Sequence, residues 1–364
     1  MQIDELNSGT AAADARLSPD CESWMDGLFV RVFRAMHTHE ADNFDAERYR
    51  GVAPTAFFAD HHARYLGFFV KHVEKFHRAR LLLADEESRA LFDQLILFRI
   101  LGHLHVRLPF NTPGALSQRT ITDGWKIGDT ADSGLLGPLA VYAVPLDDME
   151  IRVKCWSENV AAMFLNQQYY FERNGVSIAP DRGNFIVDAG GCFGDTALAF
   201  ARSAGARGHV YTFDPMQKHC AIMRESFAMN PALAPRISIF ECGLSNVDRE
   251  GSSSEGASDA INPGATIFGG EMRLRTVDSL VAEGAIARID FIKMDIEGSE
   301  LDALAGAEAA LHRWRPKLAI SLYHRPEDFF AIPLWLDALQ AGYRFFLDHY
   351  SIHVEETVLY AVAD

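Results

Sequence analysis

The chain contains little cysteine, and the arrangement of its cysteines excludes two kinds of scaffold. Five cysteines are scattered over 364 residues, and no C-x-x-C pair occurs. A disulfide framework uses paired cysteines, and a zinc knuckle uses closely spaced ones. The sequence fits neither, and sparse cysteine is typical of a reducing compartment. We therefore expect a cytoplasmic protein.

Long apolar runs, basic charge and internal repeats are also scarce. The most apolar run, residues 91–102, is interrupted by Asp93, Gln94 and Arg99, so we expect no membrane insertion. The first residues have neither a basic nor an apolar stretch, which argues against a signal peptide. Lys and Arg number 34 against 50 Asp and Glu, a net charge of −16. An acidic surface repels phosphate backbones, so we expect no nucleic-acid partner.

Shifts in composition divide the chain into four predicted parts. These are a flexible start (1–20), a helical domain (21–105), a loop-rich linker with many Pro, Gly and Ser residues (106–150) and an α/β domain (151–364). In the second part, Tyr65, Phe69, Val73 and Phe76 are spaced to share one face of a helix. We expect this helical domain to cap the α/β domain.

The last part alternates between short apolar segments and helix-forming segments, the βαβ pattern. Seven strands are expected. The final two, 345–349 and 357–362, have only a short connection, whereas a parallel return needs a crossover. The pattern predicts an α/β fold with a Rossmann-like, seven-stranded sheet whose last strand is antiparallel. Residues 244–271 form a polar insertion that we expect to be a surface loop, with a possible role as a lid.

The first of these strands runs into a glycine turn, V-D-A-G-G-C-F-G-D-T, at 187–196. Gly190 and Gly194 allow a tight turn and close approach to a ligand. A dinucleotide site requires G-x-G-x-x-G, but Ala189 occupies the first glycine position. Asp188 precedes the turn, and a carboxylate suits a cationic ligand such as S-adenosylmethionine better than a pyrophosphate. The alternative for Asp188 is a structural cap at the strand end.

Acidic residues and one histidine follow later strands. Asp214 comes 24 residues after Gly190, the position from which an acid commonly binds ribose. Asp295 ends another strand, and His324 ends the next. Because parallel strands end at one edge of a sheet, these side chains should meet there. His324 could accept a proton from an attacking hydroxyl, with Asp295 as second candidate; the alternatives are a turn acid and a loop histidine.

Three segments together resemble the FkbM-type S-adenosylmethionine-dependent methyltransferases. V-D-A-G-G-C-F-G-D-T resembles that family's D-x-G-A-N-x-G turn, T-F-D-P its F-E-P segment, and F-I-K-M-D-I-E-G-S-E-L-D-A-L-A-G-A its K-I-D-V-E-G-x-E segment. The resemblance covers roughly residues 160–364. It implies O-methylation of a hydroxyl on a sugar, a glycan or another polyhydroxylated metabolite. Gly191 and Cys192 depart from the family's Ala-Asn, and Asp214 replaces its Glu.

The resemblance also implies roles for single residues. The turn residues and their leading acid would hold the methionine end of the cofactor, and these are Asp188, Gly190, Gly191, Phe193 and Gly194. Asp214 would bind the ribose, Gly243 and Leu244 would flank the adenine, and Asp295 would lie by the transferred methyl group.

Several alternatives remain open from the sequence. No metal ligand is assigned, although a metal-assisted reaction could use Asp295, Glu297 and His324. Eight histidines lie between His37 and His105, and we interpret them as surface and cleft residues. A binding protein without turnover and a nicotinamide-dependent oxidoreductase are the rival functions. A homo-oligomer is possible.

Overall fold

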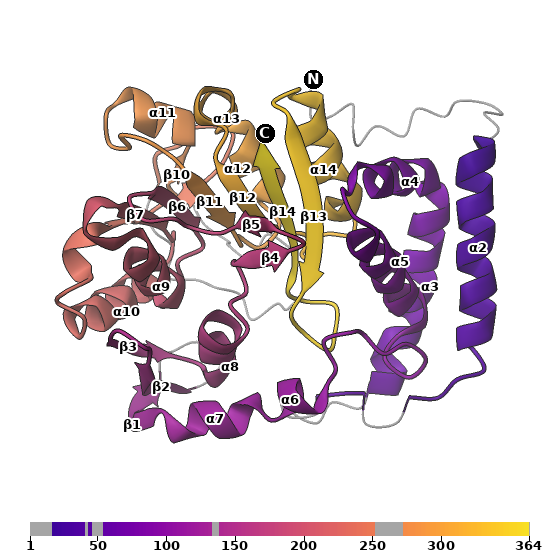
Figure 1. The fold of residues 1–364 in the computed structure, drawn as a ribbon, viewed down its shortest axis with the longest axis horizontal. Coiled ribbons are helices and arrows are strands. Elements are labelled where there is room, and N and C mark those ends of the chain that lie inside the picture. Colours follow the sequence, from indigo (N-terminus) through magenta and orange to yellow (C-terminus); the bar gives the residue numbers. More distant parts are fainter. Residues whose placement is uncertain (1–16, 41–42, 46–53, 133–137, 252–271, 364) are drawn as a thin grey trace.

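The computed structural model describes residues 17–40, 43–45, 54–132, 138–251 and 272–363. Its centre is a seven-stranded sheet with the order β13-β14-β12-β11-β6-β7-β8 (Figure 1). The strands are β6 (Phe185–Ala189), β7 (His209–Phe213), β8 (Ile237–Phe240), β11 (Phe291–Met294), β12 (Lys317–Ser321), β13 (Tyr343–His349) and β14 (Thr357–Ala363).

Strand β14 runs antiparallel to both of its neighbours, β12 and β13, whereas the pairs from β12 to β8 are parallel. The predicted α/β class and the antiparallel last strand are therefore confirmed. The segment between β13 and β14 is too short for a crossover helix, so the chain returns as an antiparallel neighbour.

Helices and small sheets cover both faces of the central sheet. Val187 and Ala189 of β6 face one hydrophobic cluster, whereas Ile186 faces the other, because side chains alternate along a strand. The first face packs on α11 (Val277–Ala282), α12 (Glu300–Ala305), α13 (Glu308–Trp314), α14 (Asp328–Ala338) and the N-terminal helices. The second face packs on α9 (Asp195–Ala204), α10 (Gln217–Ala228) and the small sheets.

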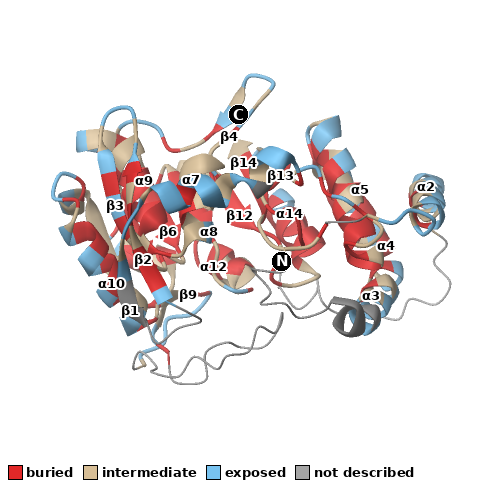
Figure 2. Cartoon of the chain, turned by 90° about the horizontal axis from the view of Figure 1, so that it is seen from below, coloured by how far each residue is buried: buried red, intermediate tan, exposed pale blue. Residues whose placement is uncertain are grey.

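The N-terminal part is helical, as predicted, and the bounds are α2 (Pro19–Ala35), α3 (Pro54–Lys71), α4 (Val73–Leu82) and α5 (Glu86–Leu101). One expectation was wrong: the run from Tyr65 to Phe76 is not one helix, because the chain breaks at His72. The break lets Phe76 turn toward α14, where its ring centroid lies 5.1 Å from that of Phe330. Buried residues line the inner sides of α4 and α5 (Figure 2).

The N-terminal helices also cover the edge of the central sheet. Leu83 forms a parallel bridge to Phe345 of β13. The N–H of Ala84 donates to the Phe345 carbonyl at 2.8 Å, and the N–H of Leu347 donates to Ser88 Oγ at 2.9 Å. The helices therefore share one core and one hydrogen-bonded edge with the sheet.

The region expected to be a linker contains regular structure. It holds α6 (Pro113–Leu116), α7 (Gln118–Gly124) and a three-stranded antiparallel sheet of β1 (Lys126–Asp132), β2 (Pro138–Pro145) and β3 (Glu150–Cys155). Strand β3 is tied to α10, since the N–H of Arg152 donates to Asn230 Oδ1 at 3.0 Å and that of Lys154 donates to Ser226 Oγ at 3.2 Å. The division into four parts stays a prediction.

The remaining short elements connect these layers. They are α8 (Ser157–Val160), a π-helical turn (Ala161–Leu165), β4 (Phe171–Arg173), β5 (Val176–Ile178), β9 (Gly243–Leu244) and β10 (Leu274–Arg275). Among the described residues, every helix is too short or too polar to cross a bilayer. Predictions for residues 1–16 and 252–271, which include most of the expected lid, fall outside the described residues.

Candidate functional site

The glycine turn joins β6 to α9, as the sequence predicts, and crowding explains its glycines. Gly190 has φ +81°, and a Cβ atom there would lie 1.9 Å from the Asp295 carbonyl oxygen. Gly194 has φ +88°, and its Cβ would lie 2.7 Å from the Phe227 ring. A side chain at Gly191 would meet the Thr212 hydroxyl at 2.1 Å. The turn is thus pressed between β7, α10 and the end of β11.

Most backbone N–H groups of this turn are already bound within the protein. Those of Gly190 and Gly191 donate to the Phe213 carbonyl at 2.9 and 3.0 Å. The N–H of Cys192 donates to Asp214 Oδ2 at 3.0 Å. A dinucleotide pyrophosphate needs free N–H groups at this place. The turn therefore lacks the phosphate-binding arrangement, in agreement with the missing first glycine.

Asp188 is fully buried beneath the turn. Its Oδ2 accepts hydrogen bonds from the hydroxyls of Thr196 at 2.9 Å and Thr212 at 3.0 Å. Its Oδ1 lies 3.4 Å from Nζ of Lys293, which is the residue beside it on β11. In this arrangement Asp188 fixes the turn from below, so its direct contact with a cofactor stays a prediction.

Lys293 is a buried cation that the sequence analysis missed. Its Nζ donates to the carbonyls of Gly190 at 2.7 Å and Ala189 at 3.1 Å. Burial opposes the charge, but Asp188 and Asp295 outweigh it and raise the pKa of Lys293. A single lysine in an otherwise apolar strand was the signal available in the sequence.

Asp214 lies at the end of β7 and is almost completely buried. Its Oδ1 accepts from the N–H of Met216 at 2.9 Å, and its Oδ2 lies 3.0 Å from Nδ1 of His219. Phe193 is fully buried, and its ring centroid lies 5.4 Å from that of His219. Asp214 therefore connects the turn to α10, and ribose binding by it stays a prediction.

Gly243 and Leu244 form β9, which pairs with β10 outside the central sheet. Leu244 is buried in the hydrophobic core, and Gly243 lies against Leu274 and Met272. Of these two residues, Gly243 is the less buried. Their contact with adenine stays a prediction.

The surroundings of the glycine turn are rich in carboxylates. Asp188, Asp195, Asp214 and Asp295 all approach it from strand ends or from the start of α9. Burial raises the pKa of Asp195 to about 6. Such a donor set fits the ammonium and sulfonium groups of S-adenosylmethionine and opposes an anion.

Asp295 and His324 meet at the sheet edge, as predicted. Nε2 of His324 lies 3.2 Å from Asp295 Oδ1. The hydroxyls of Tyr323 and Tyr169 donate to Asp295 at 3.0 and 2.9 Å. Burial alone would raise the pKa of Asp295, but the adjacent His324 and Lys293 hold it well below its usual value. Asp295 is thus ionised, and it accepts hydrogen bonds from the hydroxyls of two tyrosines.

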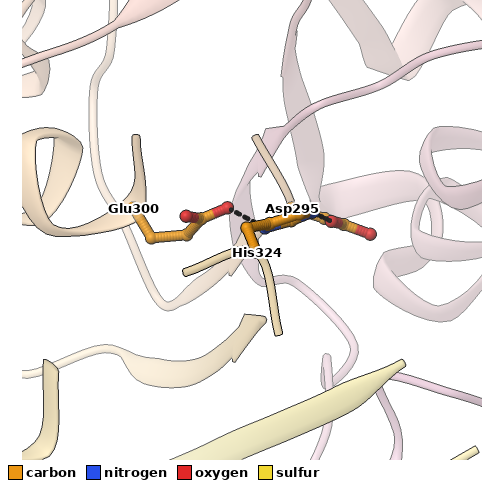
Figure 3. Close-up of side chains that lie close together, drawn as sticks. All are labelled: Asp295, Glu300 and His324. Carbon is orange, nitrogen blue, oxygen red and sulfur yellow. Dashed lines mark ion pairs between the residues drawn. The ribbon is translucent and has the colours of Figure 1, made fainter. Parts of the chain in front are cut away.

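His324 lies between carboxylates on both edges of its ring (Figure 3). Nδ1 lies 2.9 Å from Glu300 Oε1, and Nε2 also lies 3.7 Å from Glu297 Oε2. Burial alone would lower the pKa of His324, but Glu300 and Asp295 raise it well above its usual value. Acceptance of a hydroxyl proton by His324 stays a prediction.

Three residues of this cluster, Glu300, Tyr169 and Tyr323, went unrecognised in the sequence analysis. Glu300 lies in the quoted E-G-S-E segment, so its position carried a signal; it is fully buried and its Oε1 accepts from the N–H of Ile296 at 2.8 Å. Tyr169 comes from the segment before the sheet, and no spacing in the sequence relates it to Asp295.

A known protein family matches the part of the chain that contains this site. Residues 188–345 match the family model described as the methyltransferase FkbM domain. This stretch contains Asp188, the glycine turn, Asp295 and His324. Residues 188–345 are thus an FkbM methyltransferase domain. The resemblance stated from the sequence is confirmed, and the rival of an oxidoreductase loses its support.

Two individual proteins are similar to this methyltransferase over part of their length. The methyltransferase FkbM from Methylobacillus flagellatus KT is 18% identical in sequence, with a TM-score of 0.52 over 81% of this chain and 60% of that one. This likeness shows the fold. The AMB antimetabolite synthetase AmbE from Pseudomonas aeruginosa is 25% identical over 42% of this chain, which is 9% of the synthetase. The chain thus spans less than two thirds of either protein.

An O-methyltransferase from Bacillus cereus, solved in complex with SAH, is 16% identical, with a TM-score of 0.34 over 57% of this chain and 80% of that one.

Proposed function

We propose that this methyltransferase transfers a methyl group from S-adenosylmethionine to a hydroxyl oxygen of a sugar, a glycan or another polyhydroxylated metabolite. The observation that carries the proposal is the set of carboxylates around a glycine turn in which most N–H groups are already bound. A cation is favoured there and a pyrophosphate is not.

The chain's own residues suggest how the cofactor is held. The turn from Gly190 to Gly194 would carry the methionine end, with Asp188 and Lys293 fixing its shape from below. Asp214 would bind the ribose once His219 moves aside, and Gly243 would border the adenine. Asp295, which is 21% exposed at its side chain, would face the transferred methyl group.

The reaction is an in-line displacement. The acceptor oxygen forms a bond to the methyl carbon, the bond from that carbon to sulfur breaks with its electron pair left on sulfur, and the hydroxyl loses its proton. Alignment alone can contribute about 7 to 11 kcal/mol toward the barrier. Both ring nitrogens of His324 already face carboxylates, at 2.9 and 3.2 Å. Asp295 is therefore the group that would orient and accept from the hydroxyl, with His324 fixing it.

The first experiment is calorimetric titration of the full chain with S-adenosylmethionine and, separately, with NAD. We expect binding of S-adenosylmethionine, no binding of NAD, and at least a tenfold loss of affinity in Asp214→Ala. Asp337→Ala, an exposed aspartate on α14, is the matched control and should bind as the wild type does.

Turnover is tested by release of S-adenosylhomocysteine against a panel of sugars and polyols. Transfer to oxygen that falls at least a hundredfold in Asp295→Asn supports the proposal. Binding of S-adenosylmethionine with no transfer to any hydroxyl would favour the binding protein without turnover, and tight NAD binding would overturn the cofactor assignment.

A further inference from the structure

Three carboxylates surround one imidazole at the ends of β11 and β12. Asp295, Glu297 and Glu300 each place an oxygen within 3.7 Å of a ring nitrogen of His324. A single imidazole can balance at most one of these charges. Carboxylates gathered in this way are stabilised by a cation of higher charge, since buried anions require compensation.

The two edges of the ring have different surroundings. Glu300 and Asp295 lie on opposite edges of the imidazole (Figure 3). One ion therefore cannot be held by Nε2 and Glu300 together. Glu300 Oε1 lies 2.9 Å from Nδ1 without a hydrogen bond of good geometry. If the ring turns, Glu300 can accept the Nδ1 proton, and the lone pair of Nε2 is then directed toward Asp295 and Glu297. A carboxylate in that position commonly fixes the tautomer of a metal-binding histidine.

We infer that Asp295, Glu297 and Nε2 of His324 form a divalent cation site, oriented by Glu300. Nε2 lies 3.2 Å from Asp295 Oδ1. Two ligands at right angles around an octahedral ion are about 3.0 Å apart, given bonds near 2.1 Å. Glu297 Oε2, at 3.7 Å from Nε2 and on a side chain that is 53% exposed, can move the remaining distance.

A second observation concerns buried polar atoms without hydrogen bonds. The side chain of His324 is only 8% exposed, yet neither ring nitrogen makes a hydrogen bond of good geometry, and Glu300 Oε2 also has none. Buried polar atoms are nearly always satisfied, so orphans of this kind call for an explanation. Among the described residues, a group with metal-ligating spacing contains the proposed ligands Asp295 and His324 together with the orienting Glu300, and Glu297 adjoins it at 3.7 Å from Nε2.

The donor set indicates the kind of ion and its use. Two carboxylates with one imidazole suit Mn²⁺ or Zn²⁺, and Mg²⁺ to a lesser extent. Three protein ligands leave positions open on the exposed side of Glu297. At these open coordination positions the ion could bind the hydroxyl oxygens of the acceptor and lower the pKa of the reacting hydroxyl. This use rests on the proposed function, whereas the site itself does not.

The test is titration of the metal-stripped full chain with MnCl2. Binding is measured as the loss of the free Mn²⁺ signal in electron paramagnetic resonance. We expect one site per chain. His324→Gln, Asp295→Asn and Glu297→Gln should each weaken binding at least tenfold, and Glu300→Gln by about 10- to 100-fold. Glu308→Gln, an exposed acid on α13, should bind as the wild type does.

The outcomes separate the site from the reaction. Circular dichroism and thermal melting confirm that each variant is folded. If His324→Gln does not fold, the test still stands on Glu297→Gln, because Glu297 is exposed. No Mn²⁺ binding by the wild type, or equal binding by all variants, would overturn the site. If the site binds Mn²⁺ but S-adenosylmethionine does not bind, only the proposed function fails. If methyl transfer is unaffected by chelators, the use in acceptor binding is wrong.

Discussion

The Nζ atom of Lys293 lies 2.7 Å from the carbonyl oxygen of Gly190, so a buried cation on β11 holds the turn that follows β6. The same atom is 3.4 Å from Asp188 Oδ1. The three residues form a link between the two central strands. This link positions the turn against Asp295, and the N–H of Asp295 in turn donates to the Ala189 carbonyl at 3.1 Å.

Replacement of that cation is expected to be costly. Lys293→Met should lower the free energy of unfolding by about 3 to 5 kcal/mol, because it leaves Asp188 as an uncompensated buried charge. Urea denaturation measures the loss. The double variant Lys293→Met with Asp188→Asn should recover part of it, and equal stability of the single and double variants would contradict the pairing.

Gly190→Ala should disrupt the turn for two separable reasons. The φ of +81° strains any other residue, and the new Cβ would lie 1.9 Å from the Asp295 carbonyl oxygen. Gly183→Ala is the matched control, since it has φ +86° and open space around its Cβ. We expect a loss of about 1 kcal/mol in the control and of several times that in Gly190→Ala, measured by thermal unfolding. Similar losses of stability in both variants would contradict the close approach of the new Cβ to the Asp295 carbonyl as a cause.

The stability of the protein should decline in acid partly because of His349. This residue is buried, and its Nδ1 lies 2.9 Å from Thr357 Oγ1. Burial lowers the pKa of His349 from 6.5 to about 3. Between these values the unfolded chain binds a proton that the folded chain does not. The stability from His349 is therefore complete above pH 6.5 and is lost as the pH falls toward 3.

The measurement is the free energy of unfolding from pH 7 to pH 4. In His349→Gln the decline should be shallower, by up to about 1.4 kcal/mol per pH unit. His312→Gln removes an exposed histidine and should keep the slope of the wild type. Parallel slopes for wild type and His349→Gln would rule out this origin.

Asp93 joins three N-terminal helices. It accepts from Trp24 Nε1 at 3.0 Å and Arg80 Nε at 2.8 Å, and Arg31 lies 3.5 Å away. Asp93→Ala should cost about 3 kcal/mol of stability, because a largely buried pair loses one partner. Asp337→Ala should cost little, and equal melting temperatures for the two variants would contradict the role of Asp93.

Much of the fold and part of the site could be predicted from the sequence. Asp188, Asp214, Asp295 and His324 each follow an apolar strand, and parallel strands bring such residues to one edge. Side-chain partners could not be predicted in this way. Tyr169 binds Asp295 from a distant segment, and nothing in the local pattern relates the two. The direction of Glu297 depends on its φ of +57°, which sequence spacing does not encode.

The helix break at His72 shows a second limit. Periodicity predicts that Tyr65 and Phe76 are buried, and both are. It does not predict the break between them, across which their ring centroids still lie 6.5 Å apart while Phe76 also packs on Phe330 of α14. Hydrophobic spacing therefore predicts burial better than helix continuity.

The bridge between Leu83 and Phe345 has a consequence for shorter forms of this methyltransferase. An outer strand with free N–H and C=O groups is a template on which another chain can add a strand. Residues 83–88 bind part of that side of β13. A protein that lacks these residues would expose unpaired backbone groups of β13. We expect it to self-associate into β-rich aggregates even where its remaining core still folds.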